Sequence, residues 1–124
     1  MVIPTLRYKD AHGAIDFLER AFGFERKAVY EDGGVVHHAE LTHGRGMVML
    51  GTQGVGDTQF DTRMSSAYVV VPDADAVYER AKAAGAEISR ELQDTDYGSR
   101  EFSARDPEGN VWSFGTYDPF AAGN

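Results

Sequence analysis

The stretch Asp106–Gly115 reads DPEGNVWSFG and joins a tight turn to a strand. Asp-Pro opens the turn, and Gly109 and Asn110 supply the backbone freedom that the turn needs. The residues VWSF that follow favour a half-buried strand. Ser113 alternates with two aromatic residues, so its side chain is expected on the opposite face of the sheet from theirs.

The same pattern occurs in the first half of the chain. Val111–Thr116 (VWSFGT) matches Met47–Thr52 (MVMLGT) at an offset of 64 residues. Two helical runs, at 14–23 and 76–85, repeat at an offset of 62 residues, which is half of the 124-residue chain. Each run has apolar residues at helical spacing and ends at a glycine. The sequence therefore predicts a duplicated unit.

Each unit is predicted to have the order βαβββ. Strands are expected at 3–8, 26–30, 35–42 and 47–50, and again at 67–71, 87–92, 99–105 and around Trp112. The polar, glycine-rich segment 51–63 is expected to link the halves. The predicted fold class is α+β, with residues 1–124 forming a single domain of two tandem modules, at 1–56 and 64–118.

The composition restricts the partners. The chain has no cysteine, which excludes thiol nucleophiles, thiolate metal sites and disulfides. Its formal net charge of -8 disfavours nucleic acid and anionic membranes, and no apolar run is long enough to span a membrane. The charge fits simple solubility or an acidic cleft that attracts a cationic ligand. Without the features of a signal peptide, a cytoplasmic location is expected.

Three stretches carry a family resemblance: RYKDAHGAIDFLERAFGFE (Arg7–Glu25), HAEL (His38–Leu41) and RDPEGNVWSF (Arg105–Phe114). Together with the duplication, they resemble the vicinal oxygen chelate superfamily, which includes glyoxalase I, extradiol dioxygenases and bleomycin-resistance proteins. The resemblance implies a curled mixed sheet with a cleft, to which each module contributes half, and helices on the outer face. It implies no single activity, because one scaffold hosts many chemistries.

Enzymes of this superfamily hold a divalent metal with His, Gln or Glu from the first and fourth strands of each module. In the repeat register, the corresponding positions are Ile3, Met49, Ser66 and Ser113. An alkyl group has no donor atom, a thioether is a soft ligand suited to Cu(I), and serine hydroxyls are weak ligands at neutral pH. We therefore expect no metal and no other cofactor, and leave open whether the protein is an enzyme.

Strand alternation places other polar residues in the expected cleft. Thr5 and Arg7 share the face of Ile3. Arg7 also matches a position where glyoxalase I carries an arginine near its substrate; it is expected either to bind a ligand carboxylate or to form an ordinary ion pair. His38 and Glu40 lie two residues apart on one strand, as an acid–base pair or as lining of the sheet.

Aromatic residues complete the expected site. Tyr68 shares a face with Ser66, and Tyr97 lies in a loop that could cover the cleft; both are expected to stack on a flat ligand or to fill space. The register of His37, Ala39 and Leu41 is expected to face the helices, with His37 itself either structural or exposed. Trp112 is expected to pack beneath the helices. The predicted ligand-binding set is Thr5, Arg7, His38, Glu40, Met49, Ser66, Tyr68, Tyr97 and Ser113.

Two main functions fit these features. The first is a metal-free homodimer, similar to the bleomycin-resistance branch, that binds a small molecule and sequesters a cationic or aromatic compound. The alternative is a lyase or isomerase of the same fold that acts on a small carbonyl or carboxylate metabolite, with His38 and Glu40 as the acid–base pair. A third is a structural or regulatory dimer with a vestigial cleft. The sequence identifies neither the ligand nor whether modules pair within one chain or between two.

Overall fold

The computed structural model describes residues 1–62 and 64–121. The first module consists of β1 (Thr5–Tyr8), α1 (Ala11–Phe22), β2 (Glu25–Asp32), β3 (Val35–His43) and β4 (Gly46–Thr52). After a short 3-10 turn, η1 (Thr58–Phe60), the second consists of β5 (Ser66–Val70), α2 (Ala74–Ala83), β6 (Glu87–Asp94), β7 (Arg100–Arg105) and β8 (Val111–Gly115). The predicted α+β class and the repeated βαβββ order are confirmed.

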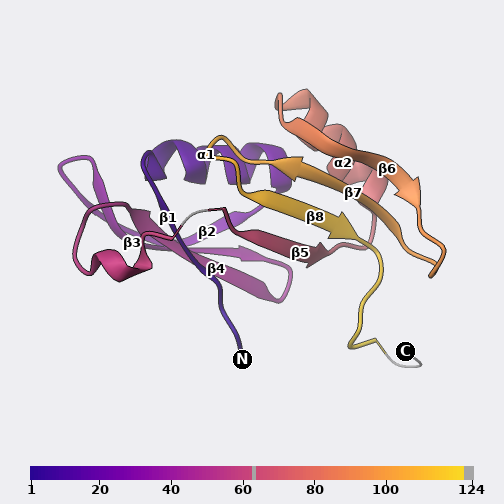
Figure 1. The fold of residues 1–124 in the computed structure, drawn as a ribbon, viewed down its shortest axis with the longest axis horizontal. Coiled ribbons are helices and arrows are strands. Elements are labelled where there is room, and N and C mark those ends of the chain that lie inside the picture. Colours follow the sequence, from indigo (N-terminus) through magenta and orange to yellow (C-terminus); the bar gives the residue numbers. More distant parts are fainter. Residues whose placement is uncertain (63, 122–124) are drawn as a thin grey trace.

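The strands form two four-stranded mixed sheets with the same topology (Figure 1). The first has the order β1-β4-β3-β2 and the second β5-β8-β7-β6. β1 is parallel to β4, and β5 is parallel to β8. Thr5 lies opposite Met49 in the first sheet, and Tyr68 lies opposite Ser113 in the second. The duplication therefore extends to the register of individual residues.

Both helices begin earlier than predicted, because an aspartate caps each N-terminus. The Asp10 side chain accepts a hydrogen bond from the Gly13 N–H, and the Asp73 side chain accepts one from the Ala76 N–H. The stop of α1 is as predicted: Gly23 adopts the left-handed conformation, with φ of 79°.

The two modules share one hydrophobic core beneath the helices. The ring of Phe22, in α1, lies 4.8 Å from that of Phe114 and 6.0 Å from that of Trp112, both in β8. Phe24 also contacts Trp112, at 5.4 Å between ring centroids. Trp112 is only 1% exposed, which confirms its predicted place under the helices.

Asp106 is a buried polar link between the modules. Its carboxylate accepts hydrogen bonds from the Tyr8 hydroxyl at 2.6 Å, the Trp112 indole N–H at 3.1 Å and the Asn110 side-chain amide at 3.0 Å. Tyr8 belongs to β1, so the bond crosses from one module to the other. Burial raises the pKa of Tyr8, and the nearby Asp106 charge raises it further.

His43 lies at the same junction, between the rings of Phe24 and Phe114. Its Nε2 atom is 2.9 Å from the Phe22 carbonyl oxygen, to which it donates a hydrogen bond. Burial lowers the pKa of His43, because the charged imidazolium is poorly solvated there, and the Arg80 charge lowers it further.

This lowered pKa gives a pH dependence of stability. Below the unfolded-state pKa of about 6.5, the unfolded chain binds a proton at His43 more readily than the folded chain does. The contribution of neutral His43 is therefore fully present above that pH and is lost as the pH falls towards the folded-state pKa. Urea unfolding across this range should show a smaller loss of stability for His43→Gln than for the parent. His12, which lies at the surface with 42% of its side chain exposed and pairs with Glu31, provides the matched control, and equal losses for His43→Gln and the parent would contradict the assignment.

One face of each sheet packs against α1 or α2, and these two helices leave the other face uncovered. We call these uncovered faces the first open face (Thr5, Arg7, His38, Glu40 and Met49) and the second open face (Ser66, Tyr68, Glu101, Ser103 and Ser113). In Figure 1, α1 lies above the first sheet and the η1 turn lies below it, while α2 lies against β6 and β7 of the second sheet. Within the described residues, neither helix has the length and apolar character that crossing a membrane requires.

Candidate functional site

The first open face contains five of the predicted ligand-binding residues. Thr5 and Glu40 lie on either side of Met49, as its partners in neighbouring strands. A hollow of about 200 Å³ is lined by Thr5, Leu6, Arg7, His37, His38, Met49, Leu50 and Phe60. It combines an apolar floor with a few polar groups, which is typical of a small-molecule site.

Arg7 is already engaged by the segment that links the modules. Its Nη1 atom donates to the Val55 carbonyl oxygen at 3.0 Å and to Asp61 Oδ1 at 3.2 Å. The Phe60 ring lies 5.8 Å from the guanidinium carbon. A ligand carboxylate at Arg7 would therefore compete with Asp61.

His38 and Glu40 form a pair, as their spacing suggested. The His38 Nε2 and Glu40 Oε2 atoms are 3.0 Å apart, and Lys27 Nζ lies 3.9 Å from the other Glu40 oxygen. The Tyr30 ring stacks on His38 with a centroid distance of 6.1 Å. This arrangement can share or move a proton, and it also presents a flat aromatic surface at the edge of the sheet.

Of the register expected to face the helices, Ala39 and Leu41 are buried, whereas His37 takes the exposed position that was its alternative. His37 is exposed and lines the same hollow as His38. The reason is a bulge in the pairing of β2 with β3: Tyr30 pairs with His38 but Glu31 pairs with Val36, which leaves His37 as the extra residue. A bulge interrupts the alternation of side chains, so a pattern of period two misplaces the bulged residue.

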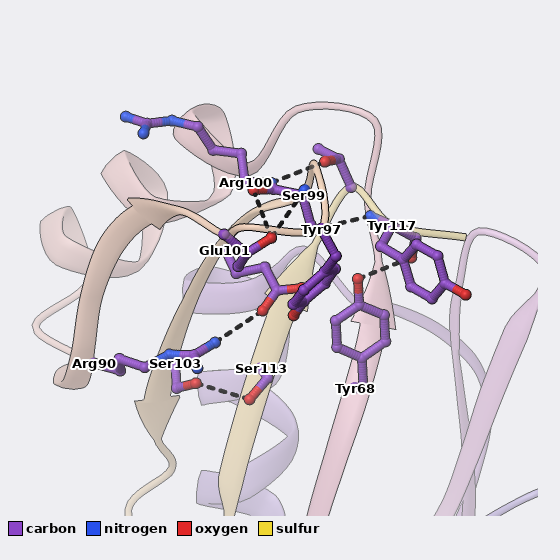
Figure 2. A network of polar contacts seen from close by, with 11 residues as sticks. Tyr68, Arg90, Tyr97, Ser99, Arg100, Glu101, Ser103, Ser113 and Tyr117 are labelled. Atoms are coloured by element: carbon purple, nitrogen blue, oxygen red, sulfur yellow. Dashed lines mark hydrogen bonds and ion pairs between the residues drawn. The ribbon is translucent and has the colours of Figure 1, made fainter. Parts of the chain in front are cut away.

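The second open face brings a different set of side chains together (Figure 2). Ser113 pairs with Tyr68 on one side and Ser103 on the other, and its hydroxyl oxygen is 2.7 Å from that of Ser103. The Tyr68 hydroxyl donates to the Tyr117 carbonyl oxygen at 2.8 Å. Tyr97 packs edge-on against Tyr117, with ring centroids 5.9 Å apart.

Glu101 is the buried centre of this cluster, with 3% of its surface exposed. The Tyr97 hydroxyl donates to one carboxylate oxygen at 2.8 Å, and Arg90 Nη2 donates to the other at 3.0 Å. Burial alone would raise the pKa of Glu101, but hydrogen bonds from Tyr97, Ser99 and Arg90 outweigh it and leave the pKa below its ordinary value. The carboxylate is therefore charged at neutral pH.

Sequence reasoning missed Glu101, Ser103 and Arg90. A signal for the first two was present: both lie on the predicted strand 99–105, which the turn at Asp106 pairs with the strand of Ser113. In this hairpin, the alternation of side chains places Ser103 and Glu101 on the same face of the sheet as Ser113. Arg90 carried no such signal, because the pairing of β6 with β7 is irregular on both sides of it.

The nine predicted site residues therefore fall into two groups. Thr5, Arg7, His38, Glu40 and Met49 belong to the first open face, and Ser66, Tyr68, Tyr97 and Ser113 lie on or beside the second. Thr5 and Ser66 line a common hollow of about 180 Å³ between β1 and β5. Within residues 1–62 and 64–121, no hydrogen bond or ion pair joins the two groups.

Gly115 allows the close packing of the second cluster. A Cβ atom there would lie against the Tyr68 hydroxyl and 2.8 Å from Glu101 Cγ. We therefore expect Gly115→Ala to destabilise the protein by about 1–3 kcal/mol through overpacking, measured by urea unfolding. Adding Tyr68→Ala to the same chain should restore part of the loss. No loss in the single variant would show that the cluster is loosely packed.

Comparison with known proteins places this geometry in a family. The sequence profile of the Glyoxalase/Bleomycin resistance protein/Dioxygenase superfamily matches residues 2–114. The chain belongs to this superfamily. An uncharacterized protein of Mycobacterium bovis is 31% identical over 121 residues, covering 90% of this chain and 80% of its own.

Solved structures similar to this chain have the same fold. TioX from Micromonospora sp. ML1 is 36% identical, with a TM-score of 0.81, and the match covers 92% of this chain and 95% of TioX. A glyoxalase I mutant from Zea mays aligns with a TM-score of 0.75 at 19% identity, over 94% of this chain and 45% of the maize chain. The second likeness concerns the fold alone.

The residues expected at the superfamily's metal-ligand positions are poor donors for a hard divalent ion. Ile3 has no donor atom, Met49 offers a thioether, and the Ser113 hydroxyl is already bonded to Ser103. Across residues 1–62 and 64–121, no group of three or more His, Cys, Asp or Glu side chains is arranged to hold a metal ion.

Proposed function

We propose that the protein binds a small, flat aromatic molecule on its open faces without a metal ion and so sequesters it. The observation that supports this proposal is the chemistry of the side chains at Ile3, Met49, Ser66 and Ser113. These residues have apolar or weakly polar groups at the positions where metal ligands are expected in the superfamily. The hollow beside Met49 gives such a ligand an apolar floor, with Phe60 and His38 at its sides.

Charge pairing on the open faces favours an aromatic ligand over a cationic one. Glu40 lies beside His38 and Lys27, and Glu101 is held by Arg90 and Tyr97. A cationic ligand would have to displace these partners to reach a carboxylate, whereas an aromatic ring needs only a flat apolar surface. The net charge of -8 therefore does not by itself select a cation.

We further propose that the protein acts as a homodimer in the cytoplasm. One chain presents its two groups of site residues on separate sheets, and a second copy can bring its second open face opposite the first open face of its partner. A groove of about 830 Å³ between the sheets, bordered by Val2, Tyr68, Val70 and Phe120, is large enough for parts of such a partner. These four residues are 41–93% exposed.

Thermal unfolding with a panel of aromatic compounds tests the binding function. Ligands that bind only the folded chain raise the melting temperature. We expect at least one aromatic compound to do so for the parent, and the shift to shrink in Phe60→Ala, because Phe60 lines the hollow. A panel without any shift, or an unchanged shift in both Phe60→Ala and Tyr68→Ala, would contradict the proposal.

The distance of 3.0 Å between His38 and Glu40 favours one second candidate, a lyase or isomerase of the same fold. It would act on a small carbonyl or carboxylate metabolite with this pair as acid and base. Turnover of such a metabolite by the parent, abolished in His38→Gln and Glu40→Gln, would support it. Turnover that persists in both variants would remove it.

A further inference from the structure

Arg90, in β6, is the starting point of a more specific inference about the second open face. Its Nη2 atom donates to Glu101 at 3.0 Å, and its side chain is 46% exposed while that of Glu101 is 4% exposed. A guanidinium has five N–H donors. Among the described residues, Arg90 has no polar partner other than Glu101. Most of its donors are therefore available on an accessible side chain.

The carboxylate of Glu101 fixes the position of this guanidinium. Glu101 lies in β7, is buried, and accepts a second hydrogen bond from Tyr97 (Figure 2). A hydrogen bond to a buried carboxylate restricts the rotamers of the exposed Arg90 side chain, which reduces the entropy lost when it binds a ligand carboxylate. Glu101 itself has both oxygens occupied and is a poor site for a ligand cation.

The other arginines near the open faces lack this combination. Arg7 is shared between Asp61 and the Val55 carbonyl oxygen. Arg105 donates to Glu87 at 3.2 Å and to the Gly109 carbonyl oxygen at 3.4 Å. Arg90 alone among these three combines a single partner that is buried with donors that remain accessible.

The surroundings of Arg90 suit an aromatic ring attached to an anionic group. Ser103 pairs with Arg90 across the two strands, and its hydroxyl is already hydrogen-bonded to that of Ser113. Tyr97 and Tyr68 are 57% and 42% exposed and present ring surface beside Glu101 and Ser113. A carboxylate at Arg90 would therefore leave its ring within the tyrosine cluster.

We propose that Arg90, positioned by Glu101, binds the carboxylate of a planar aromatic acid whose ring packs against Tyr97 and Tyr68. This inference rests on the proposed binding function and names the ligand class of the same site. The sequence suggested that Arg7 binds a ligand carboxylate, and the present proposal assigns this role to Arg90. Glu101 acts through Arg90 as a positioning residue and does not touch the ligand.

Three probes with the same ring system and different charge test the proposal: 2-naphthoate, 2-naphthamide and 2-naphthylmethylammonium. Their dissociation constants are measured by NMR titration. For the parent, we expect 2-naphthoate to bind about tenfold more tightly than the neutral amide, as one charge-assisted hydrogen bond provides. Arg90→Gln should remove this preference without weakening amide binding, and Glu101→Gln should reduce it.

Arg105→Gln is the matched control, because it removes the same charge from the same face and should leave the preference intact. The proposal is overturned if the amide or the ammonium binds as well as 2-naphthoate, or if Arg90→Gln and Arg105→Gln behave alike; the binding function survives either result. Failure of all three probes to bind, together with an aromatic panel that gives no thermal shift, would overturn the proposed function as well.

Discussion

Asp106→Ala should lower the free energy of unfolding by about 3–5 kcal/mol, because it removes one partner of a buried charged network. Asp106 is 5% exposed and accepts hydrogen bonds from Tyr8, Trp112 and Asn110. It also accepts from the backbone N–H groups of Glu108 and Asn110. The alanine would leave these donors buried and unpaired, and would release the contact between β1 and the β7–β8 turn.

Urea unfolding followed by Trp112 fluorescence measures this loss. Tyr8→Phe deletes only one of the bonds and should cost about 1–3 kcal/mol. Asp96→Ala is the control, because Asp96 is an exposed aspartate in a turn and its loss should change stability by less than about 0.5 kcal/mol. A loss for Asp106→Ala no larger than that of Asp96→Ala would show that the network does not stabilise the fold.

Phe22→Ala should destabilise the protein by a similar amount, about 3–5 kcal/mol, by opening a cavity between the modules. Phe22 is 1% exposed and packs against Phe17, Trp112 and Phe114. Because α1 belongs to the first module and β8 to the second, this ring joins the two halves of the core. Loss of the Phe22 ring should weaken the contact between the two modules and lower the free energy of unfolding.

The control for this prediction is Phe60→Ala, which removes the same ring from a site that is 48% exposed. We expect Phe60→Ala to change the free energy of unfolding little and to weaken ligand binding strongly. Phe22→Ala should lower the free energy of unfolding strongly. The comparison uses urea midpoints for both variants. Two broad, separate transitions in Phe22→Ala would show that the modules can unfold one at a time.

The sequence predicts the fold well because the deciding signals are local and occur twice. The helix-ending Gly23, the DPEGN turn and the alternation around Ser113 each depend on a few neighbouring residues. The repeat then supplies the long-range information that single elements lack. The turn also has a second role that its sequence does not reveal, since Asp106 reaches across to Tyr8.

The candidate site is less predictable because it depends on contacts between distant segments. The ion pair between Arg7 and Asp61 depends on the path of the segment that links the modules. The exposure of His37 depends on a bulge in the pairing of β2 with β3. The burial of Glu101 needs Tyr97 and Arg90, which come from a loop and a different strand. Alternation along one strand assigns faces but cannot assign partners.

The most direct test of the central claim is elemental analysis of the purified, dialysed protein combined with calorimetric titration of Zn²⁺ and Mn²⁺. Side chains such as those of Ile3 and Met49 should give far less than one bound ion per chain and no saturable heat of binding. One tightly held divalent ion per chain, lost on Ser113→Ala or Ser66→Ala, would contradict the account.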